Sequence, residues 1–215
     1  MIAALRYEQP MLASLIAYTI AAALLTITPG ADTLLVVRHA GGRGKRAGFA
    51  AAAGVCLGTL VWGAIVAVGV AALIVASPLL FTTLKWAGAA YLVWLGMTLL
   101  LPRPDKAKTD TPPHPPQSGS AFTSGLLTNL LNPKVGVFYL AFLPQFIPPG
   151  VPQAPFILLL AAIHSMLGMM WFGILIAGVD KAAGRLRDSR ASDILAKVTG
   201  ILFVGFGARL LLSSR

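Results

Sequence analysis

The sequence predicts an all-α polytopic membrane protein whose six transmembrane helices form two inverted three-helix repeats. Three observations support this fold class. The 215-residue chain is 57% hydrophobic and only 11% charged, with a mean hydropathy of +0.80, whereas soluble domains contain about 25% charged residues. Its apolar stretches reach the ~20 residues that a helix needs to cross a bilayer. Its basic residues are concentrated in alternate loops between those stretches.

Six apolar stretches are candidate spans when hydropathy is averaged over a window of about 19 residues. In chain order they are Leu12–Val37, Phe49–Ala76, Leu79–Leu101, Phe122–Ile147, Pro155–Val179 and Ile194–Leu212. The first and the fourth contain proline at an interior position, and the other four read as continuous helices. We therefore expect helices 1 and 4 of the six to be broken.

A polar segment separates the third span from the fourth. Pro102–Ser120 is rich in proline and polar residues, so it cannot bury enough apolar surface to fold. We interpret this segment, residues 102–120, as a flexible cytosolic linker between a first repeat (residues 1–101) and a second (residues 121–215). Two consecutive three-helix units insert with opposite orientations, which is the inverted-repeat plan of many secondary transporters.

The distribution of Lys and Arg predicts the orientation of the spans. These residues cluster between spans one and two, three and four, and five and six, whereas residues 77–78 and 148–154 carry no charge. Because cytosolic loops are enriched in Lys and Arg, the three basic loops are expected in the cytosol and both termini outside it. No basic face forms despite the net charge of +10, so no nucleic-acid partner is expected.

The prolines that interrupt spans one and four are expected near the middle of the bilayer. Pro29 lies nine residues before Arg38 and Pro133 eleven residues after Phe122, which is roughly 14–17 Å at 1.5 Å per residue. This is about half of a ~30 Å hydrocarbon core. Backbone groups freed at that depth must be buried in protein or line a wet cavity. Paired interruptions near the midplane are typical of a transport site.

The residues around the two interruptions form the candidate substrate-binding site. They are Pro29, Gly30 and Asp32 in span one, with Asn129, Asn132, Pro133 and Lys134 in span four. Asp32 would attract an ammonium group and Lys134 a carboxylate, which favours a zwitterionic substrate, and the asparagine amides can fix its orientation. Charges inside membrane helices are costly and usually functional. A structural ion pair between Asp32 and Lys134 is the alternative, and Asp32 is also the candidate for proton coupling.

Other classes of function have less support in the sequence. The alternative function is a passive channel or a permease for another small solute or ion. A metal permease would favour several ligands inside the spans, yet only Asp32, Cys56 and His164 lie there, widely separated in sequence. The chain has no nucleophile–base or metal-ligand spacing, so we expect neither an enzyme nor a cofactor.

A small-residue pattern in the second span predicts close helix packing. Gly54 and Gly58 form a GxxxG pattern, which lets two helix backbones approach each other. The partner helix belongs either to the same chain, which we favour, or to a second copy in a homodimer. Membrane lipid is the other expected partner of these apolar helices.

Five segments together resemble the LysE/RhtB family of amino-acid exporters. They are Thr28–Ala40 (TPGADTLLVVRHA), Gly48–Gly63, Leu84–Gly96, Gly125–Phe146 and Thr199–Leu210, in the family's order. The resemblance implies an exporter of amino acids or related small molecules in the bacterial inner membrane, driven by the proton motive force. Ala31 stands where the family usually has a second proline, so a softer first break is expected. Basic, neutral and modified amino acids all fit the resemblance.

Overall fold

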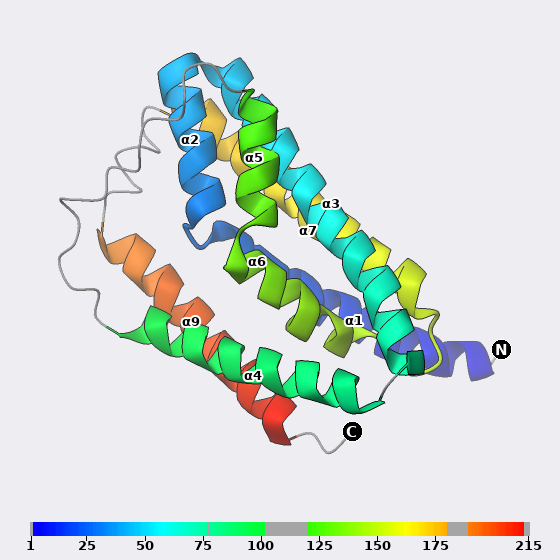
Figure 1. Ribbon diagram of the computed structural model, residues 1–215. Coiled ribbons are helices and arrows are strands. Elements are labelled where there is room, and N and C mark those ends of the chain that lie inside the picture. Colours follow the sequence, from blue (N-terminus) through cyan, green and yellow to red (C-terminus); the bar gives the residue numbers. More distant parts are fainter. Residues whose placement is uncertain (1, 77, 102–119, 180–188, 213–215) are drawn as a thin grey trace.

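The computed structural model describes residues 2–76, 78–101, 120–179 and 189–212, and the regular structure in these ranges is helical throughout (Figure 1). In chain order the elements are α1 (Ile2–Ile27), α2 (Ala31–Arg43), α3 (Lys45–Ala76), α4 (Pro78–Leu100), α5 (Ala121–Leu130), α6 (Pro133–Val137), the π-helix η1 (Phe138–Phe142), the 3-10 helix η2 (Leu143–Phe146), α7 (Gln153–Ala177) and α9 (Ser189–Leu212). The all-helical class is therefore confirmed for the described residues. The predicted linker lies outside them, except for Ser120.

Several of these helices are long and apolar enough to span a membrane. Within the described residues, Lys45–Gly69 and Gln153–Ala177 meet this condition as single helices. Two bent pairs meet it together, α1 with α2 and α5 with the segment Pro133–Phe146, which makes up to four spans. The apolar parts of α4 and α9 are shorter. The six-span arrangement stays a prediction.

Both interruptions predicted from interior prolines are present. The segment Met11–Ile27 and α2 are bent by 53° relative to each other, and α5 and Pro133–Phe146 by 51°. Pro29 lies between α1 and α2, where Gly30 is the N-cap of α2. Pro133 is the first residue of α6, a position where its missing N–H removes no helical hydrogen bond. The first bend is as large as the second, although Ala31 stands in place of a proline.

The contacts between helices pair the two halves of the chain. α3 packs on α7, and α4 packs on α9, which joins predicted span two to span five and span three to span six. α5 also packs on α3, and α1 packs on α7. Exchanging the first three spans with the last three maps the α3–α7 and α4–α9 pairings onto themselves and the α3–α5 pairing onto α1–α7. The inverted-repeat arrangement stays a prediction.

Glycines allow the backbones of α3 and α5 to approach closely. A Cβ atom at Gly54 would overlap the carbonyl oxygen of Phe122, and one at Gly125 would overlap that of Ala51. At Gly58 it would lie 2.6 Å from Oδ1 of Asn129. The GxxxG pattern therefore packs against a helix of the same chain, which was the favoured of its two predicted uses. This packing holds Asn129 against α3.

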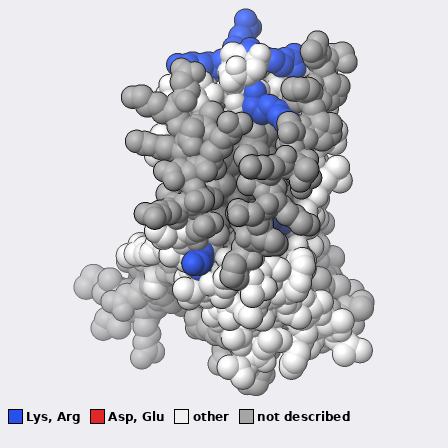
Figure 2. All heavy atoms as spheres, turned by 90° about the vertical axis from the view of Figure 1, so that its left-hand side faces the viewer, with Lys and Arg blue, Asp and Glu red and all other residues white. Residues whose placement is uncertain are grey.

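Basic side chains gather at one end of the molecule. Figure 2 shows Lys and Arg side chains at the end where α2 meets α3, a region that contains Arg38, Arg43, Lys45 and Arg46. Lys45 Nζ also donates to the carbonyl of Ala177 at 3.4 Å, so the C-terminal end of α7 lies at the same end. Figure 1 shows that α1 begins and α9 ends on the opposite side. The α2–α3 junction and the C-terminal end of α7 thus lie at the same end of the molecule, whereas most of the loop between spans five and six lies outside the described residues.

Candidate functional site

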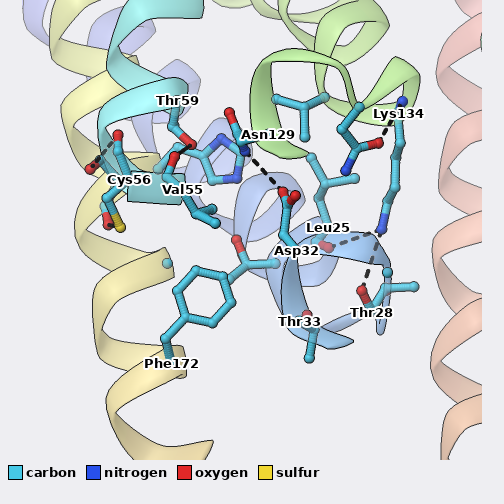
Figure 3. A pocket seen from close by; sticks show the side chains of 17 residues that line it. Leu25, Thr28, Asp32, Thr33, Val55, Cys56, Thr59, Asn129, Lys134 and Phe172 are labelled. Carbon is cyan, nitrogen blue, oxygen red and sulfur yellow. Dashed lines mark hydrogen bonds between the residues drawn. The ribbon is translucent and has the colours of Figure 1, made fainter. Parts of the chain in front are cut away.

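A cavity of about 50 Å³ lies where the two helix breaks meet (Figure 3). A cavity needs roughly 10–15 Å³ of such space to hold a water, so this one is large enough for ordered water. Its walls come from both breaks and from α3 and α7. The lining residues are Leu25, Thr26, Thr28, Gly30, Asp32, Thr33, Val55, Cys56, Thr59, Asn129, Asn132, Lys134, Val135, His164, Ser165, Gly168 and Phe172.

The cavity brings together most of the residues that the sequence singled out. Of the predicted site residues, the lining includes Gly30, Asp32, Asn129, Asn132 and Lys134. Pro29 and Pro133 lie within the breaks but outside the lining, so their contribution is to the backbone path. The carboxylate of span one and the ammonium group of span four therefore face a common space, from two different helix breaks.

Asp32 lies in the first turn of α2 and is held by Asn129 of α5. Asn129 Nδ2 donates to Asp32 Oδ2 at 2.9 Å. The other two oxygens of this pair, Asp32 Oδ1 and Asn129 Oδ1, are buried and accept no hydrogen bond within the described part of the chain. Buried acceptors without a donor cost about 1–3 kcal/mol each. Asn129 Oδ1 faces Gly58 of α3, so Asp32 Oδ1 is the acceptor of this pair that remains for an incoming donor.

Lys134 connects the second break to the first. Its Nζ donates to the carbonyls of Leu25 at 3.3 Å and Thr28 at 3.4 Å, both at the C-terminal end of α1. In a continuous helix the Leu25 carbonyl would accept from residue 29, but Pro29 has no N–H. The Lys134 ammonium group takes the place of that donor. Its positive charge at the C-terminal end of α1 also interacts favourably with the negative end of the helix dipole.

Asn132 and Thr28 fix the backbone at the two breaks. Asn132 Oδ1 accepts from the backbone N–H of Lys134 at 3.1 Å and so caps α6. Thr28 Oγ1 hydrogen-bonds to the Leu24 carbonyl at 2.6 Å and to the buried hydroxyl of Thr199 on α9. The first break is therefore connected to α9, which packs on α4. At the second break, the Asn132 cap fixes the backbone from which the Lys134 side chain extends.

The remaining wall is formed by α3 and α7, which the sequence did not assign to the site. Ser165 Oγ donates to the Cys56 carbonyl at 3.3 Å, and Cys56 Sγ donates to the Ser165 carbonyl at 3.4 Å. Thr59 Oγ1 donates to the Val55 carbonyl of its own helix at 3.1 Å. Because these polar groups already have backbone partners, the wall presents a mainly apolar surface to the cavity.

His164 also lines the cavity, on α7. Its Nδ1 lies 3.2 Å from the Tyr139 hydroxyl, and the two rings stack with centroids 5.8 Å apart. Tyr139 belongs to the π-helix η1, a type of irregularity that is frequent at functional sites. His164, Gly168 and Phe172 are spaced by four residues, so they form one stripe along α7. Within the described residues, no three His, Cys, Asp or Glu side chains are placed to hold a metal ion.

Comparison with known proteins places these features in a family. The profile described as LysE type translocator matches residues 23–214. The chain is 34% identical over 208 residues to the uncharacterized membrane protein YrhP of Bacillus subtilis, with 93% of this chain and 99% of that protein covered. It is 36% identical over 205 residues to the uncharacterized membrane protein PA4757 of Pseudomonas aeruginosa, with 90% and 92% covered.

A relative with a stated activity has similar coverage. The leucine efflux protein of Salmonella typhimurium is 32% identical over 200 residues, which cover 90% of this chain and 92% of that protein. No solved structure matches the chain. The similarity to these proteins extends over both helix breaks and over α3 and α7.

Proposed function

The chain belongs to the LysE type translocator family, and from this premise we propose that it exports amino acids from the cytoplasm. The resemblance to leucine efflux proteins supports an amino acid as the substrate. We place the substrate in the cavity between the two helix breaks. An exporter requires a site that can open to either side of the membrane, and paired broken helices supply such a site in many secondary transporters.

One observation carries the location of the site: a carboxylate from one break and an ammonium group from the other line the same cavity. The substrate ammonium group would donate to Asp32 Oδ1, a buried acceptor that has no donor within the described residues. The substrate carboxylate would bind Lys134 Nζ. Hydrogen bonds to charged groups contribute about 1.5–3 kcal/mol each, so both ends of a zwitterion are bound favourably.

Substrate binding at Lys134 competes with the backbone of the first break. In this structure, Lys134 Nζ donates to the carbonyls of Leu25 and Thr28. A substrate carboxylate is a stronger acceptor for an ammonium group than a neutral carbonyl is. We therefore expect substrate binding to weaken the hydrogen bonds from Lys134 to the first break. The two breaks could then move apart, as access from alternate sides of the membrane requires.

Counterflow in proteoliposomes tests the proposed function. Vesicles preloaded with an unlabelled amino acid are diluted into the same labelled amino acid, with leucine, threonine and lysine tested in parallel. We expect labelled substrate to accumulate transiently above equilibrium for at least one of them. Uptake of label that only reaches equilibrium and is not stimulated by internal substrate would indicate a channel. Absence of counterflow for every amino acid tested would refute the proposal.

We also propose that export is coupled to proton entry and that Asp32 carries the proton. Asp32 is the one carboxylate among the residues that line the cavity. The Asp32→Asn variant keeps the shape of the side chain and an oxygen that can accept from Asn129, but it cannot release a proton. In inside-out membrane vesicles at saturating substrate, we expect both proteins to catalyse counterflow, but respiration to stimulate uptake by the wild type and not by Asp32→Asn. Equal stimulation of both proteins would exclude Asp32 as the coupling group.

We propose further that the basic end of the molecule faces the cytosol of a bacterial inner membrane, with both termini outside. The gathering of Arg38, Arg43, Lys45 and Arg46 at that end supports this orientation. Alkaline phosphatase fused after Leu212 is expected to be active, because it requires the outer side, whereas the enzyme fused after Gly44 is expected to be inactive. The reverse pattern would invert the orientation.

A further inference from the structure

We propose that Gly168 on α7 sets the size of the substrate side chain, in a wall that selects amino acids with apolar side chains. This inference rests on the proposed function and specifies the substrate class of the same site. It follows from where the cavity has charge, where it has apolar surface and where it has unfilled space.

The charged and apolar groups occupy different sides of the cavity. Figure 3 shows Lys134 and Thr28 on one side of Asp32, and Val55, Cys56 and Phe172 on the other. A zwitterion whose charged groups bind Asp32 and Lys134 therefore has the α3–α7 wall left for its side chain. Gly168 lies on α7 between Ser165 and Phe172 and lines the same cavity.

The α3–α7 wall is poorly suited to a polar or charged side chain. The hydroxyl groups of Thr59 and Ser165 and the thiol of Cys56 donate to backbone carbonyls, and His164 Nδ1 is paired with the Tyr139 hydroxyl. A charged substrate side chain would lose its hydration there without a charged partner from the wall. An apolar side chain gains from the same surface, because its transfer out of water is favourable.

Gly168 differs from the glycines that helix packing requires. At Gly54, Gly125 and Gly58, a Cβ atom would overlap or crowd a neighbouring helix. At Gly168, a Cβ atom would lie 3.7 Å from Cys56 Sγ and 3.8 Å from Phe172 Cε2, which are ordinary van der Waals distances. Alanine therefore fits at this position without displacing either neighbour, and it is the better helix former. Its methyl group would take up part of a cavity of only about 50 Å³.

A methyl group in the wall is expected to change selectivity more than activity. One methylene in an apolar pocket changes discrimination by about 10- to 200-fold. The Gly168→Ala variant should therefore lower the ratio of leucine to alanine counterflow by about 10-fold or more, mainly through loss of leucine transport. Val55→Ala removes bulk from the α3 side of the wall. It should change selectivity in the opposite direction and raise the ratio of phenylalanine to leucine.

The test measures counterflow of labelled leucine, phenylalanine, alanine and lysine by the wild type and by these two variants. Gly173→Ala is the matched control, because Gly173 lies on the same helix, faces open space and does not line the cavity. We expect the control to keep the wild-type ratios. Thermal unfolding in detergent verifies that each variant is folded, and the opposite change in Val55→Ala provides a second test if Gly168→Ala cannot be purified.

The outcomes separate this inference from the function on which it rests. Unchanged ratios in the folded Gly168→Ala or Val55→Ala variants would overturn the role of the wall, and so would lysine counterflow that exceeds leucine counterflow in the wild type. Amino-acid export would survive either result. Absence of counterflow by the wild type with every amino acid would instead remove the proposed function itself.

Discussion

Replacing Lys134 with alanine is expected to lower amino-acid counterflow by about 10- to 150-fold, because a charge-assisted contact with the substrate carboxylate contributes about 1.5–3 kcal/mol. The variant also removes the donor that serves the Leu25 carbonyl, whose helical partner is missing at Pro29. Rates are measured in proteoliposomes and divided by the amount of reconstituted protein, so that a loss of folded protein is not counted as a loss of transport.

Lys45→Ala is the matched control for this prediction. Lys45 Nζ also donates to a backbone carbonyl, that of Ala177, but it lies at the exposed basic end and does not line the cavity. Its replacement is expected to leave counterflow within about twofold of the wild type, as for most surface substitutions. If Lys134→Ala retained a rate similar to that of Lys45→Ala, then Lys134 would not bind substrate.

Replacing Gly54 with alanine is expected to destabilise the protein strongly. The new methyl group would overlap the carbonyl oxygen of Phe122, and a backbone group cannot move aside as a flexible side chain does. Overpacking of this kind costs about 1–3 kcal/mol or more. It would also separate α3 from α5 and thereby displace Asn129, whose carbonyl accepts from Trp62 Nε1 at 3.4 Å. We therefore expect a lower unfolding temperature together with slower transport.

The chain contains its own reporter for that measurement. Cys56 is the one cysteine in the sequence and is buried, so a thiol-reactive fluorophore labels it as the protein unfolds. During heating in detergent, we expect labelling of Gly54→Ala at a clearly lower temperature than that of the wild type. Gly173→Ala makes the same chemical change where no atom lies within 4 Å and should unfold at the wild-type temperature or above it. Equal temperatures for the two variants would refute the packing explanation.

The two helix breaks and their charges could be predicted from the sequence because the signals are local. An interior proline interrupts a helix wherever it occurs in the chain, and a charge in an apolar segment stands out from its neighbours. Pro29 and Pro133 therefore located both breaks, and the adjacent Asp32 and Lys134 pointed to a common site. The structure places both side chains at one cavity.

The α3–α7 wall could not be predicted in this way because its members are ordinary residues of apolar helices. Nothing local distinguishes Gly168, which faces a cavity, from Gly54, which faces a helix backbone. Only the arrangement of α7 against α3 decides which stripe of each helix faces the cavity. The contact between Lys134 and the Leu25 carbonyl was likewise hidden. A proline shows which carbonyl loses its donor, but not which distant side chain replaces that donor.

Binding of a radiolabelled amino acid to the purified protein tests directly whether the two helix breaks share one substrate site. The ligand is the amino acid that gives the strongest counterflow, and the proteins are the wild type, Asp32→Asn, Lys134→Ala and the Lys45→Ala control. Saturable binding is expected for the wild type and for Lys45→Ala, with affinity lowered about 10-fold or more in each of the other two variants. Wild-type affinity in both Asp32→Asn and Lys134→Ala would place the substrate elsewhere.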